Sequence, residues 1–181
     1  VNLSPDYVAR MWLTERARFS YLSNGKHTIN MRGMASMTLN IIQRYGLEPF
    51  DAYPNYKGVN YNVMARTATQ IAHAATSFNI LENRLADALN HNIGYLPPTL
   101  FMFGVEYTPL EFAHSVCLPG EYEALTSFSH YPFNQKFVLE TPDNQLRDSF
   151  MNVPLDSMMN RIEQSLRNGH PVCWEGDISE P

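Results

Sequence analysis

VMARTATQIAHAATSFNILENRLADALNHNIGYLPPTLFMF, residues 63–103, is the stretch in which a helical pattern gives way to a strand-like one. Up to residue 92 the apolar side chains recur at helical spacing, which predicts one long amphipathic helix. The pattern ends before Gly94, and the pair Pro97 and Pro98 prevents the helix from continuing. The apolar run at residues 100–103 then predicts a short buried strand. The sequence therefore favours a mixed α+β fold. The positions that carry the helical repeat are Ile71, Ala74, Ala75, Phe78, Leu81, Leu85 and Leu89.

Further helices are expected at residues 4–20, 34–46, 108–114 and 154–169. The first has a serine cap followed by a proline suited to the first helical turn. The third opens with the Thr–Pro–Leu–Glu pattern of a capping box. The second and fourth end at Gly46 and Gly169, since glycine readily adopts the backbone conformation that terminates a helix.

Strands are expected at residues 124–128, 136–139 and 171–174, where short apolar runs are bounded by turn residues. Cys173 lies in the last of these runs, where a cysteine is usually a small buried apolar residue. Trp12 and Trp174 are expected to be core or rim aromatic residues rather than binding platforms.

Composition excludes several classes of protein. The chain has 181 residues, of which 44% are hydrophobic and 17% charged, so it fits about one globular domain. Its net charge of -5 argues against a nucleic-acid partner, because that affinity rests on clustered Lys and Arg. No apolar run is long enough to span a membrane and no signal peptide is visible, so the expected location is cytoplasmic. The sequence leaves open a targeting segment upstream of Val1.

Three stretches, in this order, carry a family resemblance. The first comprises LSPDY at 3–7, RGM at 32–34, LNIIQRYGLEP at 39–49 and YP at 53–54. The second comprises PPTLF at 97–101 and TPLEF at 108–112. The third comprises MNVPL at 151–155, NGHPV at 168–172 and DIS at 177–179. Each motif alone is unspecific, but their joint order and spacing resemble the papain-like cysteine peptidases of the bleomycin hydrolase and aminopeptidase C branch.

The resemblance implies a papain-like fold, mostly the helical lobe plus the first strands of the β lobe. Residues 1–181 would form a single incomplete domain. Within it, 1–95 would be the helical part, 96–150 an insertion typical of the branch, and 151–181 a helix and strand leading into the β lobe. The resemblance also implies a thiol-dependent aminopeptidase that acts on short peptides without a cofactor, and a homo-oligomer, which in this branch is often a hexamer.

No catalytic residue is assigned within this chain. Such an enzyme needs a thiolate activated by an imidazole that an asparagine orients. By the resemblance, the cysteine precedes Val1 and the histidine and asparagine follow Pro181. Cys117 follows His114 by three residues, but it is expected at the C-terminal end of its helix, where the dipole disfavours a thiolate. Cys173 is expected to be a core residue, with a place in the active-site wall as the alternative.

Substrate-binding residues are expected at Arg32, Gly33 and Met34. In the family, a glycine-rich rim before this helix lets extended substrate backbone approach, which a residue without Cβ permits. Arg32 stands where relatives often have a second glycine, so it would narrow the cleft or place a cation beside a peptide carboxylate. Met34 would border a side-chain pocket. The alternative is that Gly33 only shapes a loop and that Met34 is an ordinary helix-core residue.

Other chemistries have weaker support. The histidines show no HExxH or paired spacing, so no metal site is expected. His170 is expected to be a turn residue. Glu175 and Asp177 would share one face of a strand, but a solvated strand end explains them as well. Two other functions stay open: a non-catalytic papain-like homologue that serves as a binding or structural module, and an unrelated α+β binding domain.

Overall fold

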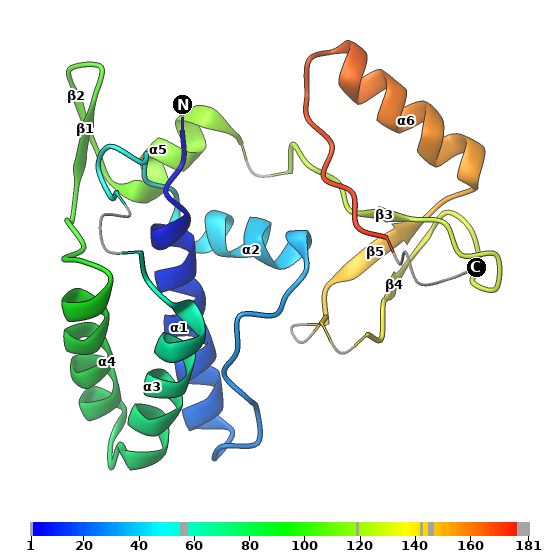
Figure 1. Cartoon of the computed structure of the whole chain (residues 1–181). Coiled ribbons are helices and arrows are strands. Elements are labelled where there is room, and N and C mark those ends of the chain that lie inside the picture. Colours follow the sequence, from blue (N-terminus) through cyan, green and yellow to red (C-terminus); the bar gives the residue numbers. More distant parts are fainter. Residues whose placement is uncertain (1, 55–57, 119, 142, 145–146, 177–181) are drawn as a thin grey trace. The chain divides into compact units, whose positions relative to one another are not determined.

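A computed structural model describes residues 2–54, 58–118, 120–141, 143–144 and 147–176. The described residues form helices and short strands, which confirms the prediction of a mixed α+β fold (Figure 1). They group into two compact units. Unit 1 comprises Val1–Arg32 and Asn40–Pro119, and unit 2 comprises Gly33–Leu39 and Gly120–Pro181.

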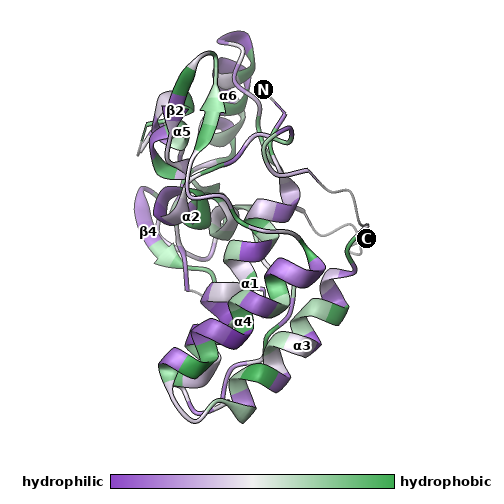
Figure 2. Cartoon of the chain, turned by 90° about the vertical axis from the view of Figure 1, so that its left-hand side faces the viewer, coloured by the Kyte–Doolittle hydropathy of each residue, from purple (hydrophilic) through white to green (hydrophobic). Residues whose placement is uncertain are grey.

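Unit 1 is built on three helices that pack side by side: α1 (Pro5–Leu22), α3 (Tyr61–Ala74) and α4 (Phe78–Asn92) (Figure 1). Figure 2 shows hydrophobic and hydrophilic residues alternating along α3 and α4, as amphipathic helices require. The predicted cap of α1 is confirmed, because the Ser4 side chain accepts a hydrogen bond from the Tyr7 amide at 3.2 Å. The fully enclosed core contains Leu13, Ala17, Ala68, Leu81, Leu85 and Leu89.

The prediction of one helix over residues 63–92 is wrong, because the chain breaks between α3 and α4. Ala75 and Ser77 have extended backbone, and the Ser77 side chain accepts a hydrogen bond from the Ile80 amide at 3.3 Å. Ser77 therefore caps a new helix. The apolar positions keep nearly the same spacing across the break, so periodicity alone could not reveal it.

Helix α2 (Ala35–Tyr45) and helix α5 (Pro109–Val116) confirm two further predictions. α2 ends before Gly46, which has a φ of +89°. α5 begins with the expected capping box between Thr108 and Glu111. The Leu47 amide donates to the Pro109 carbonyl at 2.9 Å, so the segment after α2 lies against the start of α5. A buried apolar cluster joins these elements and consists of Leu47, Leu100, Phe112 and Ala113.

Strands β1 (Leu100–Met102) and β2 (Val105–Tyr107) form an antiparallel hairpin. The strand near residue 100 was predicted, but it is not buried throughout: Leu100 is enclosed, whereas Phe101 is 72% exposed. Phe103 and Gly104 both have positive φ and form the turn. β2 was not predicted, because Val105 and Tyr107 lie beside charged and capping residues and not in an apolar run.

Unit 2 contains a three-stranded sheet of β3 (Leu125–Thr126), β4 (Gln135–Val138) and β5 (Ser149–Asn152). β5 is central; it pairs parallel to β3 and antiparallel to β4. β3 and β4 were predicted from the sequence, whereas β5 was not. Helix α6 (Leu155–Arg167) follows, as predicted, and none of its thirteen residues is buried. The Arg161 side chain pairs with Glu123 in the same unit.

The strand predicted at residues 171–174 is wrong, because this segment has no regular secondary structure. Trp174 is 73% exposed, whereas Trp12 lies in the core of unit 1 as expected. A strand needs a partner for its backbone groups, and an apolar run does not specify one. Among the helices of the described residues, none combines the length and the apolar character that crossing a bilayer requires.

Candidate functional site

The segment that leads to Gly33 is anchored to α1 within unit 1. The Trp12 indole N–H donates to the carbonyl of Asn30 at 2.8 Å, and Arg16 Nη2 donates to the carbonyl of Thr28 at 3.0 Å. The Asn30 side chain then accepts a hydrogen bond from the Arg32 amide at 3.0 Å. These contacts fix the backbone before Gly33, while the Arg32 side chain remains exposed.

The residues after Gly33 form the first turn of α2 in unit 2. Met34 is half-buried, and its carbonyl accepts a hydrogen bond from the Met37 amide at 3.0 Å. The Ala35 amide donates to Glu175 Oε1 at 2.5 Å, and Ser36 Oγ donates to Asp148 Oδ2 at 2.9 Å. Carboxylates are favoured at a helix N-terminus, because the amides there lack partners within the helix.

The three predicted substrate-binding residues are consecutive, and the division between the units falls between Arg32 and Gly33. Arg32 and Gly33 are exposed, as contact with a ligand requires. Glu175 does not lie on a strand; it binds the start of α2. Its proposed companion Asp177 lies outside the described residues.

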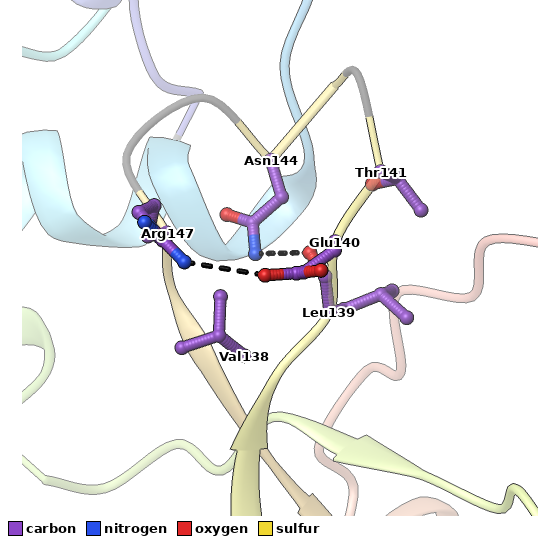
Figure 3. A pocket seen from close by; sticks show the side chains of 6 residues that line it. All are labelled: Val138, Leu139, Glu140, Thr141, Asn144 and Arg147. Atoms are coloured by element: carbon purple, nitrogen blue, oxygen red, sulfur yellow. Dashed lines mark hydrogen bonds and ion pairs between the residues drawn. The ribbon is translucent and has the colours of Figure 1, made fainter.

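A hollow of about 380 Å³ lies in unit 2 between the ends of β4 and β5 (Figure 3). Its walls include the exposed ion pair of Glu140 and Arg147, whose charged atoms are 3.2 Å apart. The buried side chain of Asn144 donates to the carbonyls of Leu139 and Asp148, at 2.9 and 2.8 Å, and so connects the two strand ends. Thr141 also lines the hollow, and its hydroxyl approaches the Met34 sulfur at 3.9 Å. The hollow carries a polar rim but no thiol.

The two cysteines lie in different surroundings. Cys117 is the C-cap of α5, as expected, and its thiol donates to the Leu118 carbonyl at 3.7 Å. The negative end of the helix dipole disfavours a thiolate there. Cys173 is exposed, so the prediction that it is a buried apolar residue is wrong. Its predicted strand does not form, which leaves the thiol in solvent.

The histidines that make ring contacts pack against aromatic side chains. His27 lies 4.3 Å from Phe19, and His130 lies 4.6 Å from Tyr131, measured between ring centroids. His170 is in the turn after α6, as predicted, and its amide donates to the Ser165 carbonyl at 3.0 Å. Within the described residues, no group of His, Cys, Asp and Glu side chains is arranged to hold a metal ion.

Unit 1 also contains a buried polar cluster that the sequence patterns did not predict. Arg10 is buried, and its guanidinium donates to the Tyr53 hydroxyl at 3.1 Å and to the Gly94 carbonyl and Asn90 side chain, both at 2.7 Å. Tyr53 donates to the same Gly94 carbonyl at 2.8 Å. The cluster therefore joins α1, the 47–54 segment and the end of α4. Arg10 lies among apolar positions of α1, and a charged residue on the apolar face of a helix is the sequence feature from which the cluster could have been predicted.

Glu48 belongs to the same region and is enclosed, with 0% of its surface exposed. Neither of its carboxylate oxygens has a hydrogen-bond partner among the residues that the structure describes. Burial raises the pKa of the Glu48 carboxyl to about 7, although the positive charge of Arg10 opposes the shift. The Glu48 carboxyl therefore keeps its proton to a higher pH than an ordinary glutamate does.

Comparison with known proteins leaves the family undetermined. No protein-family model matches the chain, and no curated protein matches it significantly.

Proposed function

We propose that this chain forms part of a thiol-dependent peptidase of the bleomycin hydrolase and aminopeptidase C type, and that it supplies walls and scaffold of the substrate cleft. The observation that carries the proposal is the order and spacing of the three motif stretches along residues 3–179. A papain-like fold, a peptide substrate and a homo-oligomer follow from the same resemblance.

The proposed chemistry is hydrolysis of the first peptide bond of a short peptide. A thiolate attacks the carbonyl carbon, an imidazole transfers the proton to the leaving amine, and water then releases the acyl group. These reactive groups belong to sequence outside residues 1–181. The placement of Cys117 at a helix C-terminus supports this division of labour, because such a thiol is poorly activated.

The role of this chain is to receive the peptide. Gly33 has no Cβ, so an extended substrate backbone can approach it closely enough for hydrogen bonds. Arg32 is exposed beside it and offers a guanidinium to the substrate's terminal carboxylate. Met34 is half-buried. Its proposed role is to border a pocket for an apolar side chain of the substrate.

The test is hydrolysis of an aminoacyl fluorogenic substrate by the protein with its flanking sequence. We expect activity that a thiol alkylator abolishes. The matched control is the double variant Cys117→Ser and Cys173→Ser, which should keep both the activity and its sensitivity to the alkylator. Loss of activity in the double variant, or hydrolysis by residues 1–181 alone, would show that the nucleophile lies in this chain.

A non-catalytic homologue is the second candidate function. It is favoured by the position of Cys117 at the C-cap of α5, where the helix dipole disfavours a thiolate. The upstream sequence separates the two: a cysteine followed by Trp or Tyr indicates the peptidase, and serine or glycine in its place indicates the non-catalytic module.

A further inference from the structure

The segment that carries Glu48 closes over the start of α1 through a short set of backbone contacts. The Ser4 amide donates to the Glu48 carbonyl at 2.9 Å, and the Phe50 amide donates to the Asn2 carbonyl at 2.7 Å. Leu3 and Pro49 pair as an isolated antiparallel bridge. Together with the Leu47 bond to Pro109, these contacts hold the Glu48 side chain inside unit 1.

The groups around Glu48 stabilise its charge poorly. Arg10 is the cation that acts on it, but the Arg10 donors are bound to Tyr53, Asn90 and Gly94. Tyr7 on α1 and Tyr53 on its own segment are the titratable groups that also interact with it, and burial raises the pKa of both. A tyrosine side chain is neutral or negative, so neither of these two residues supplies a positive charge to stabilise the carboxylate.

Other titratable groups nearby are already engaged. Asp6 accepts a hydrogen bond from the Tyr61 hydroxyl of α3, and Tyr45 of α2 is bound to Glu15 and Arg18. α5 meets the segment through the backbone of Pro109. An ionised Glu48 therefore has little to replace its lost hydration except water that enters when the segment moves.

We propose that Glu48 is a proton-dependent switch: its neutral carboxyl allows the 47–54 segment to close over the start of α1, and its ionisation releases that segment. The switch lies apart from Arg32 and Gly33 in the sequence, and it does not depend on the proposed peptidase. It gives unit 1 a structural response to pH changes near neutrality.

The direction of the pH effect follows from proton binding. The pKa of Glu48 is about 7 in the folded chain and about 4.5 as the ordinary value. Between these values the folded state keeps a proton that the unfolded state has released, so stability falls as pH rises. This contribution to stability is fully present below the ordinary pKa of about 4.5 and is lost once the pH has risen above about 7. The two pKa values differ by about 2.5 units, so at tenfold per unit the unfolding equilibrium constant should change by roughly three hundredfold.

The experiment compares the 181-residue chain with Glu48→Gln, which has a similar shape and no charge at any pH. Urea unfolding between pH 4.5 and 8 should show a steeper loss of stability with pH in the original chain than in the variant. Glu140→Gln, which removes an exposed carboxyl in unit 2, is the control and should keep the original slope. An unchanged slope in Glu48→Gln would refute the switch.

A second measurement needs no variant. The ¹³Cδ chemical shift of Glu48 should titrate with a midpoint near pH 7, and the amide protons of Ser4, Leu47 and Phe50 should exchange faster across the same transition. A midpoint near the ordinary value would overturn the proposal. So would a raised midpoint without faster exchange, because the ionised carboxylate would then be tolerated inside the closed segment.

Discussion

Asn152 shows how a single buried amide can organise a loop. It is fully enclosed at the end of β5, and its side-chain amide donates to the carbonyls of Phe128, Tyr131 and Pro132 at 3.0–3.2 Å. Its side-chain oxygen accepts from the Phe128 amide at 2.8 Å. These bonds fix the aromatic residues that follow β3. In the sequence, Asn152 lies in a segment for which no strand was predicted, so only the fold reveals its importance.

We expect Asn152→Ala to destabilise the protein by about 2–4 kcal/mol, because it leaves several buried backbone groups without partners. Denaturant unfolding measures the change. Asn160→Ala on the exposed surface of α6 is the control and should cost less than about 0.5 kcal/mol. Similar losses in both variants would mean that the Asn152 bonds contribute little.

Gly46 is constrained both by its backbone and by its surroundings. Its φ is +89°, and a Cβ placed there would lie 2.2 Å from the carbonyl of Pro109. Gly169 has a similar φ of +80° but open space around it. A side chain at Gly169 would therefore meet only backbone strain, whereas one at Gly46 would meet backbone strain and a steric clash.

Gly169→Ala should cost about 1–2 kcal/mol, the usual penalty for a left-handed residue with a Cβ. Gly46→Ala should cost at least about 3 kcal/mol, since the start of α5 must also move. Urea unfolding of both variants gives the comparison. Equal losses of unfolding free energy in the two variants would show that α5 can shift without destabilising the protein.

At the scale of elements, several helix ends were predicted from residues that act locally, either through a capping side chain or through the backbone freedom of glycine. Ser4, Thr108 and Gly46 marked true boundaries, because their side chains or backbone freedom act locally. Ser77 was equally informative but lay inside an uninterrupted apolar repeat. Strands were predicted less well: β5 depends on its partners β3 and β4, which are remote in sequence.

The break between α3 and α4 makes a prediction about Ser77. Ser77→Ala removes the acceptor for the Ile80 amide and should cost about 1 kcal/mol. Ser77→Asp keeps an acceptor and adds a negative charge at the N-terminus of α4, so it should retain or exceed the original stability. Thermal unfolding resolves both. If Ser77→Ala left the stability unchanged, tertiary packing alone would determine the break between α3 and α4.

At the scale of the molecule, the substrate-binding residues stay a prediction. Arg32, Gly33 and Met34 were chosen from a motif, and the first two are exposed. The buried cluster of Arg10, Tyr53 and Glu48 could not be predicted, because its members are brought together by the packing of α1 with the 47–54 segment. Local sequence patterns can predict helix caps and exposed loop residues, whereas buried polar contacts between distant segments can be identified only once the fold is known.

The charge balance of the chain bears on how a peptide would be recognised. Acidic residues outnumber basic ones by 18 to 13, so the net charge of the chain disfavours the approach of a substrate carboxylate. Arg32 is an exposed cation next to the glycine at which substrate backbone is proposed to lie. An arginine can bind a carboxylate through two parallel hydrogen bonds, which gives it a geometric as well as an electrostatic preference.

In the protein with its flanking sequence, Arg32→Ala should therefore raise KM about tenfold for peptides that end in a free carboxylate, with kcat nearly unchanged. The same peptides with an amidated C-terminus lack the charge, so their KM should differ little between the two proteins. Arg32→Lys should recover part of the binding, because it keeps the charge but loses the paired donors. Steady-state kinetics on the matched acid and amide peptides measure the effect. An equal rise in KM for both would indicate that Arg32 shapes the cleft wall instead of binding the carboxylate.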